Sequence, residues 1–232
     1  MKTTKYLIIL CLLCATLGTP AVASPNEDLF TAARSGTVEG VKSALANGAE
    51  VNNSKSDHDG ATPLMRASEA RYAGGDYANV IEVLLAKGAN VNAQDITGAT
   101  ALIYATISRN PPIVRLLLKK GADVNVRGGG STALIFALDH RGGDSDLFSK
   151  QAEIAKLLLD AGADVNATDD FGKTALMQAA GNNQVDAVRL LLDKGANIYA
   201  KDDNQKTALD YATSSHSEPV RAILEERARR LD

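Results

Sequence analysis

Residues 162–177 read GADVNATDDFGKTALM, and this stretch decides the fold because its phrases return along the chain. The first phrase, Gly-Ala followed by an acidic or amide residue and then Val or Ile, occurs five times. A leucine-rich segment precedes each copy, as IAKLLLDA does at 154–161, and a Thr-x-Leu follows each copy. Self-similarity at a period of about 20–50 residues is typical of stacked repeats. The copies of the first phrase lie at residues 48–52, 88–92, 121–125, 162–166 and 195–198, and the threonines are Thr62, Thr100, Thr132, Thr174 and Thr207.

Each repeat predicts two helices joined by turns. The threonine is expected to cap the first helix, and Pro63 stands where the first turn of a helix tolerates proline. Leu64 and Ala67 follow the i, i+3 spacing of a buried stripe. The glycine of Gly-Ala is expected to end the second helix, since a left-handed C-cap favours glycine. No such unit can close its own core, so burial requires stacking of neighbours.

The tripeptide Gly172-Lys173-Thr174, with Ala167 five residues before Gly172, fits the loosest form of a phosphate-binding loop. The repeats give it another origin, because the aligned copies end in the same threonine while the lysine varies. Asp169 and Asp170 would also meet a phosphate with like charge. We therefore interpret the tripeptide as a repeat turn and expect no nucleotide cofactor.

The N-terminus resembles a secretory signal peptide. Lys2 and Lys5 precede an apolar run at 6–17 that is short for a membrane span, and Ala21 and Ala23 form a small-x-small cleavage pattern. We expect cleavage after Ala23, so that 1–23 is a signal and 24–232 is the mature domain. A lipoprotein signal is disfavoured because a leucine precedes the second cysteine, and an uncleaved anchor is the remaining alternative.

The composition of the predicted mature chain restricts its chemistry. Both cysteines lie within 1–23, so the remainder has no disulfide and no thiolate ligand. Without Lys2 and Lys5, 23 basic residues face 28 acidic ones, a net charge of −5. This balance argues against a general nucleic-acid binder. The style of the signal is bacterial, so we expect the periplasm, with secretion as the alternative. We expect no membrane insertion of the mature chain.

The repeats resemble the ankyrin-repeat family, whose unit runs Gly-x-Thr-Pro-Leu, Ala-Ala, Leu-Leu-Leu and Gly-Ala-Asp-Val-Asn. The resemblance covers nearly all of 27–232, although only Pro63 keeps the proline and no unit keeps the histidine that follows Thr-Pro-Leu. It implies an all-α solenoid of about six helix-turn-helix units with short β-hairpin-like turns. The expected units are 27–58 (N-terminal cap), 59–94, 95–126, 127–168, 169–201 and 202–232 (C-terminal cap).

Two units are longer than the others. From the threonine to the glycine of Gly-Ala is 21 positions in the units of Thr100 and Thr174, but 26 after Thr62 and 30 after Thr132. Both additions carry Gly-Gly-Asp and are expected between the two helices. They are either tolerated surface insertions, a second contact surface, or a remnant of duplication. The residues assigned to this lower-ranked surface are Arg71, Tyr72, Asp76, Tyr77, His140, Arg141, Asp144 and Phe148.

The family's usual binding surface is a concave groove lined by turn tips and first helices, so the resemblance implies a protein partner there. Ile96 and Phe171 stand at turn positions where burial is not required, and an exposed aromatic residue would suit a partner contact. For Tyr104 and Phe136 we favour core packing over contact. The expected groove residues are His58, Asp59, Arg66, Glu69, Ile96, Thr97, Ile107, Asp139, Asp170, Phe171, Asn182, Asp203 and Asn204.

No catalytic or metal-binding pattern stands out. The three histidines lie in different units, and neither His-Glu-x-x-His nor Gly-x-Ser-x-Gly occurs. Paired aspartates at equivalent turns are explained by turn chemistry. We therefore expect a monomeric, non-enzymatic binding scaffold without cofactor or metal. Three roles remain open: binding an endogenous periplasmic protein, neutralising a periplasmic toxin as an immunity protein, or binding a host protein as a secreted effector.

Overall fold

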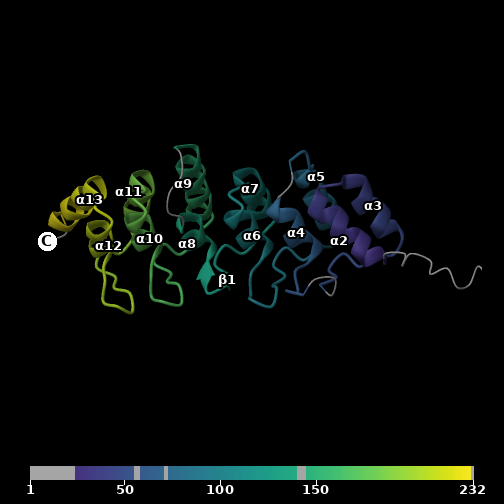
Figure 1. Ribbon diagram of the computed structural model, residues 1–232, viewed down its shortest axis with the longest axis horizontal. Coiled ribbons are helices and arrows are strands. Elements are labelled where there is room, and N and C mark those ends of the chain that lie inside the picture. Colours follow the sequence, from purple (N-terminus) through teal and green to yellow (C-terminus); the bar gives the residue numbers. More distant parts are fainter. Residues whose placement is uncertain (1–23, 55–57, 71–72, 140–144, 231–232) are drawn as a thin grey trace, which may run out of the picture.

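The computed structural model describes residues 24–54, 58–70, 73–139 and 145–230, and it shows helix pairs stacked in one row. In Figure 1 the second helices of the pairs form the upper edge of the row, the first helices lie below them, and the loops hang beneath. The predicted all-α solenoid is confirmed. The predicted signal, residues 1–23, lies outside the described residues. Within the described residues, no helix combines the length and the apolar character needed to cross a membrane.

The first and second helices alternate along the chain. The first helices are α2 Pro25–Ser35, α4 Pro63–Glu69, α6 Ala101–Ile107, α8 Ala133–Leu138, α10 Ala175–Gly181 and α12 Ala208–Ser214. The second helices are α3 Val38–Ala46, α5 Tyr77–Ala86, α7 Pro111–Lys119, α9 Ser145–Asp160, α11 Val185–Asp193 and α13 Glu218–Arg229. We number the pairs as units 1 to 6 in chain order.

The threonine caps differ among the units. The hydroxyl of Thr62 accepts the N–H of Met65, and the Met65 Sδ accepts the N–H of Thr62; Thr174 forms the same reciprocal box. The prediction of a capping hydroxyl is wrong for Thr100 and Thr132, whose hydroxyls are buried without a partner in the described chain. In these two units an isoleucine replaces the residue that closes the box, and its side chain offers no acceptor.

The glycines of the Gly-Ala phrases turn the chain out of the second helices, as predicted. Gly88 has φ 90° and Gly162 has φ 92°, a region that L-residues with a Cβ avoid. The core is one continuous cluster along the row. Leu64 and Ala67 of α4 are buried, and so is Leu158 of α9. Stacking rather than the single pair therefore creates the core.

A row of asparagine side chains joins consecutive units. Asn125 donates from Nδ2 to the carbonyl of Gly162 (3.2 Å), and its Oδ1 accepts the N–H of Asp164 (2.9 Å). Asn52, Asn92 and Asn166 make the same pair of bonds to the next Gly-Ala phrase. Only an amide side chain provides a donor and an acceptor side by side. We call this row the asparagine ladder.

The turns between units form fingertips that bond to one another through their backbones. The N–H of Ile96 donates to Asp59 O (3.0 Å), that of Gly129 to Thr97 O (2.9 Å), and that of Asp170 to Gly130 O (3.0 Å). The described chain has one two-stranded sheet, the antiparallel hairpin of β1 Arg127–Gly128 and β2 Ser131–Thr132 in the unit 4 fingertip. The fingertips therefore form a continuous edge below the first helices.

The two longer units contain less loop than the sequence suggested. In unit 2, Tyr77 is the first residue of α5 rather than a loop residue, and it is buried. Its hydroxyl donates to Arg34 O (3.2 Å), and the N–H of Asp76 donates to Gly36 O (2.9 Å). In unit 4 part of the addition lengthens α9 to 16 residues, against nine in α7. Both additions therefore serve partly to extend the packing.

Candidate functional site

The fingertips and first helices together form one side of the row, which we call the inner face. Three large apolar side chains lie exposed on it: Ile96 (75% exposed), Phe171 (67%) and Ile107 (51%). The predicted exposure of Ile96 and Phe171 is confirmed. Thr97, Asp170 and Asp139 are exposed on the same face. These six members of the predicted groove therefore gather around the fingertips of units 3 to 5.

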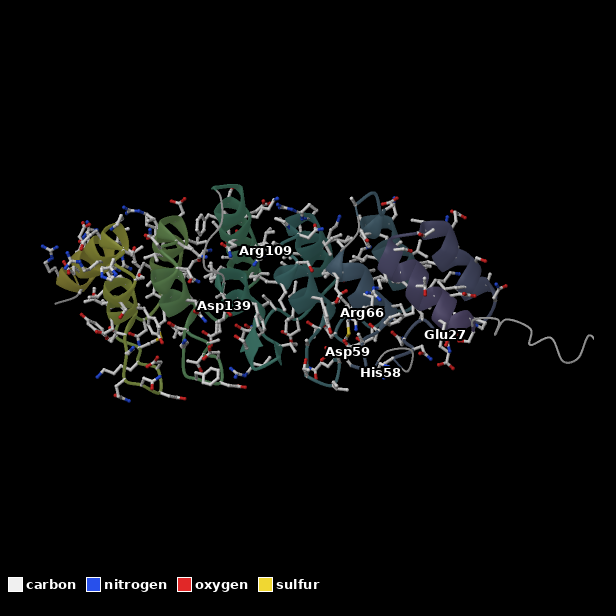
Figure 2. All side chains as sticks on the ribbon, viewed as in Figure 1. Glu27, His58, Asp59, Arg66, Arg109 and Asp139 are labelled. Carbon is white, nitrogen blue, oxygen red and sulfur yellow. The ribbon has the colours of Figure 1, made fainter. Side chains whose placement is uncertain are left out.

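At the unit 2 end of this face, an arginine is enclosed by aromatic rings and acids. The Arg66 guanidinium lies 5.7 Å from the Phe30 ring centroid and 5.6 Å from that of Tyr104. It donates to Glu69 (2.7 Å) and pairs with Asp59. Figure 2 shows Arg66 above Asp59, on the way from the first helices to the fingertips. We call this arrangement the arginine cage.

The arginine cage corrects two of the predicted contacts. Arg66 and Glu69 are both buried, at 9% and 3% exposure, so they are structural and are not available to a partner. Asp59 is half-buried. Burial raises the pKa of Asp59, but the Ala61 N–H and the Arg66 guanidinium outweigh this effect and lower the pKa. Asp59 therefore stays ionised as the partner of Arg66.

The unit 3 fingertip is closed by an aspartate that the sequence analysis did not single out. Asp95 Oδ1 accepts the N–H groups of Thr97 (2.7 Å) and Ala99 (2.9 Å), and its Oδ2 accepts the Tyr104 hydroxyl (2.7 Å). Burial, and then the hydrogen bond to Asp95, raise the pKa of Tyr104. Tyr104 is half-buried and acts as a strut between helix and fingertip. The aspartates at the same place in the turns of units 5 and 6, Asp169 and Asp202, were the signal available in the sequence.

Two hollows lie on the inner face, on either side of the unit 4 fingertip. The first is lined by Asp59, Asp95, Ile103, Tyr104, Ile107 and Phe136. The second is lined by Phe136, Asp139, Asp169, Asp170, Phe171 and Gln178. Gly129 and Phe136 belong to both, so the hollows share a wall.

The other predicted contacts are distributed differently. Asn182 is half-buried and donates from Nδ2 to Leu138 O (2.7 Å), so part of its side chain is used within the chain. Phe148 is a residue of α9 rather than of a loop, and it lies half-buried in a hollow that Asn183 and Gln184 also line. His58, Asp203 and Asn204 are exposed at fingertips. The remaining predicted residues lie outside the described residues: Arg71, Tyr72, His140, Arg141 and Asp144.

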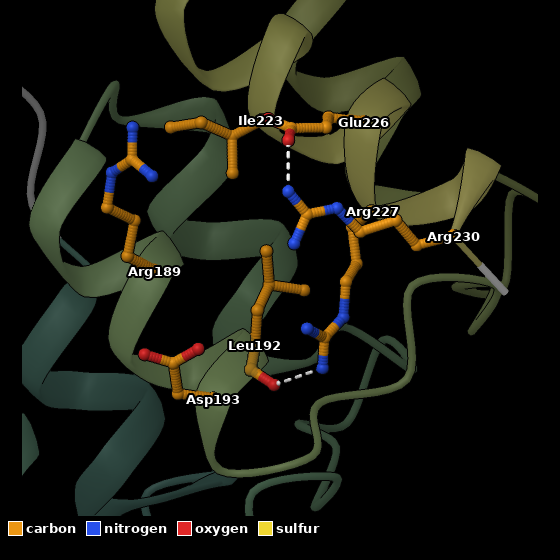
Figure 3. Close-up of a pocket in the computed structure, with 7 residues that line it drawn as sticks. All are labelled: Arg189, Leu192, Asp193, Ile223, Glu226, Arg227 and Arg230. Atoms are coloured by element: carbon orange, nitrogen blue, oxygen red, sulfur yellow. Dashed lines mark hydrogen bonds and ion pairs between the residues drawn. The ribbon is translucent and has the colours of Figure 1, made fainter.

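A third hollow at the C-terminal end contains three arginines and was not predicted. Figure 3 shows it between α11 and α13, where Arg227 donates to Leu192 O (3.0 Å) and Arg230 pairs with Glu226. The first of these bonds satisfies a carbonyl at the end of α11, where a cation is favoured. Arg189 and Asp193 complete the rim with opposite charges. The hollow is explained by docking of the last helix.

No group of three or more His, Cys, Asp or Glu residues suited to a metal ion occurs within the described ranges. The chemistry of the inner face is instead that of apolar side chains, aromatic rings and carboxylates on a bonded framework. Such a surface can recognise another molecule.

Comparisons with known proteins agree with this geometry. A family model described as ankyrin repeats, three copies, matches residues 26–95, 72–169 and 145–230. The chain belongs to the ankyrin-repeat family. The ankyrin repeat is a protein-interaction module, and this family membership confirms the predicted resemblance.

Curated ankyrin-repeat relatives match about half of the chain. The mitochondrial disaggregase of Bos taurus is 39% identical over 122 residues, which make up 50% of this chain and 17% of that protein. The ankyrin repeat and SOCS box protein 6 of Homo sapiens is 40% identical over 106 residues, 44% of this chain and 23% of that protein. The matched segments thus span less than a quarter of the length of these relatives.

Solved structures match over most of the chain. A crystal structure of an ankyrin repeat protein is 28% identical with a TM-score of 0.71, covering 87% of this chain and 98% of that one. A chain from the complex of a predatory endopeptidase of Bdellovibrio bacteriovorus with an immunity protein is 25% identical with a TM-score of 0.70. That match covers 86% of this ankyrin-repeat chain and 97% of the other.

Proposed function

We propose that this ankyrin-repeat chain is an exported, non-enzymatic scaffold that binds a protein partner through its inner face. The observation that carries the proposal is the exposure of Ile96, Ile107 and Phe171 on one face. Large apolar side chains gathered on a surface mark interaction sites, and buried aromatic anchors dominate the energetics of interfaces.

The framework beneath these side chains supports the same proposal. The fingertips bond to one another through backbone groups, and Asp169 Oδ1 holds the unit 5 tip by accepting the N–H groups of Phe171 (2.9 Å) and Lys173 (2.8 Å). A surface held in place before binding loses little entropy when the partner arrives. The chain therefore presents Phe171 as a fixed anchor.

Binding through the inner face is tested by affinity capture from a periplasmic extract. The bait is the purified protein, compared with an Ile96→Ala, Phe171→Ala double variant. Tyr199→Ala is the matched control, since Tyr199 is also a large exposed side chain (54%) but lies outside the inner face. We expect the double variant to lose a partner that the control retains, with unchanged melting temperatures. A partner retained by the double variant contradicts the assignment of the inner face.

Export to the periplasm is the second part of the proposal, and it rests on the signal-like pattern of 1–23. Cell fractionation with mass determination of the purified chain tests it. We expect a periplasmic protein that begins at Ser24. A cytoplasmic chain that keeps residues 1–23 contradicts it.

The neighbour crystallised with a predatory endopeptidase favours one second candidate, an immunity function. In this case the partner of the inner face is a bacterial endopeptidase that the chain inhibits. The test is hydrolysis by a purified endopeptidase encoded beside this chain, with and without one equivalent of the chain. Inhibition that the Ile96→Ala, Phe171→Ala variant lacks supports the candidate, and full activity with bound chain contradicts it.

A further inference from the structure

The second hollow of the inner face has the walls of an arginine site but no arginine. Phe136 and Phe171 supply aromatic walls, and Asp139 and Asp170 supply carboxylates. No basic residue lines this hollow. Asp139 is exposed, and its carboxylate has no hydrogen-bond or ion-pair partner in the part of the chain that the structure describes. Negative charge beside aromatic rings, with no basic residue in the lining, suits a cation from outside.

The carboxylates of this hollow differ in how fully they are already used. Asp169 is engaged by its own turn. Asp170 pairs through Oδ1 with Arg127 (2.6 Å), which leaves its Oδ2 and a side chain that is 64% exposed. The Asp139 carboxylate has no partner among the described residues. Asp139 is therefore the main charge available to a ligand, with Asp170 as a second acceptor.

The arginine cage of unit 2 shows what this chain places in such surroundings. Arg66 stands four residues after Thr62, between two aromatic rings and beside two carboxylates. The corresponding residue of unit 5, four positions after Thr174, is Gln178, and it lines the second hollow. The position that holds a guanidinium in unit 2 thus holds a neutral amide in unit 5.

The first hollow is suited to a different side chain. Its carboxylates are already engaged, Asp59 by Arg66 and Asp95 by Thr97, Ala99 and Tyr104, and its wall includes Ile107. What remains for a ligand is an apolar surface. The two hollows are adjacent, because Gly129 and Phe136 line both of them.

We propose that the second hollow receives an arginine side chain of the partner, and that the first hollow receives an apolar side chain next to it in the same segment. The inference rests on the proposed function and adds the chemistry of the partner: a segment that carries a guanidinium beside an apolar residue. Both parts follow from charge complementarity. The second hollow offers the Asp139 carboxylate, which has no cationic partner among the described residues, and the first hollow offers no unused charge.

The test uses a random peptide library displayed on phage, selected against the protein purified after expression of the full chain. Selected peptides are then synthesised with fluorescein, and their affinities are measured by anisotropy. We expect arginine next to apolar residues among the selected sequences. Replacing that arginine with citrulline, which keeps the shape and removes the charge, is expected to weaken binding about fivefold or more.

Variants of the chain locate the bound arginine. Gln178→Arg would place an internal guanidinium in the second hollow, as in unit 2, and is expected to abolish binding while the melting temperature is retained. Asp139→Asn is expected to weaken binding about as much as citrulline does. Asp193→Asn, a change of the same kind at an exposed site on α11, is the control and is expected to bind normally.

The outcomes separate this inference from the proposed function. Peptides that lack basic residues but are lost in the Ile96→Ala, Phe171→Ala variant overturn the inference and leave inner-face binding standing. Peptides that ignore both of those substitutions count against both proposals. Peptides that bind Gln178→Arg as tightly as the native chain also overturn the inference. A selection without any binding peptide overturns it too, and the capture experiment then decides the proposed function alone.

Discussion

The fingertips of units 4 and 5 occupy equivalent places and are built in different ways. In unit 5, Asp169 closes the turn with its carboxylate, and Phe171 is presented at the tip. In unit 4 the corresponding residue is Arg127, which reaches across to Asp170, and the turn is closed by pairing of β1 with β2. Glycines follow Arg127 at 128–130, so no side chain stands at the tip.

The difference between these fingertips explains the hollows of the inner face. Gly128 packs so closely on unit 3 that a Cβ would lie 2.4 Å from the backbone of Ala99. The unit 4 tip therefore has no side chain between those of Ile96 and Phe171, which are exposed on the neighbouring tips. A few substitutions within one repeated loop thus change a presented side chain into a recess, while the helices keep the same packing.

The largest expected effect tests whether the two units differ only at their tips. Leu158 of α9 and Leu191 of α11 are both fully buried. Leu158→Ala and Leu191→Ala are each expected to lower the free energy of unfolding by about 2–5 kcal/mol, because each leaves a cavity. Urea denaturation of both variants measures this. A native-like midpoint for Leu158→Ala alone would show that the long α9 packs differently from α11.

The close approach of the unit 4 fingertip gives the next effect. Gly128→Ala forces the backbone of units 3 and 4 apart and is expected to cost about 1–3 kcal/mol. Gly129→Ala meets only Phe136 at 3.5 Å, but its φ of 61° is left-handed, so about 1 kcal/mol is expected. Thermal unfolding of the two variants ranks them. An equal loss would mean that the close contact with Ala99 relaxes without cost.

The threonines before the first helices of units 4 and 5, Thr132 and Thr174, are expected to differ in what their hydroxyls contribute to stability. Thr174→Val removes a hydroxyl that accepts the N–H of Met177 and should cost about 1 kcal/mol. Thr132→Val removes a buried hydroxyl that has no partner in the described chain, so it should be neutral or stabilising. Chemical denaturation curves for the pair measure the difference. A loss of stability in Thr132→Val would reveal a bonded hydroxyl.

The smallest expected effect is the pH dependence of the stability that Asp95 contributes. Burial raises the pKa of Asp95, but hydrogen bonds from Thr97, Tyr104 and Ala99 outweigh it, and the pKa is lowered from its usual value. The stability from this group is present above the unfolded pKa of about 3.9 and is lost as pH falls through the folded pKa. Asp95→Asn should therefore differ from the native chain at pH 6 and approach it below about pH 4. Melting temperatures across this range test the convergence, and a constant difference would contradict it.

Much of the fold follows from short phrases in the sequence. The glycines after the second helices, Pro63 and the spacing of Leu64 and Ala67 each have a local physical reason, and the structure confirms them. Phe171 was also predictable as an exposed residue, since its place in the turn requires no burial. Local rules suffice wherever a residue's role depends on its own unit.

The parts that could not be predicted depend on contacts between units. The pattern of its own helix predicts an exposed Arg66. In the structure Phe30 and Tyr104, which come from the units on either side, enclose it. The sequence predicts Tyr77 to be a loop residue because it follows Gly-Gly-Asp. The start of α5 at Tyr77 depends instead on packing against Arg34 of unit 1, which the sequence of unit 2 does not reveal. Residues with partners in other units thus need the stacking register, which the repeat phrase alone does not give.

The asparagine ladder has a consequence for how such a chain can change its length. Each rung joins an asparagine side chain only to backbone atoms of the following Gly-Ala phrase, so the coupling is the same whichever unit follows. Asn26 begins the series by accepting the N–H of Glu50, and Tyr199 stands where the next asparagine would be. The interior units therefore share one standard connector along this edge of the row, and a gene that copies or deletes a unit by recombination keeps this connector intact. Tyr199, which replaces the asparagine after the fifth Gly-Ala phrase, is where the asparagine ladder ends.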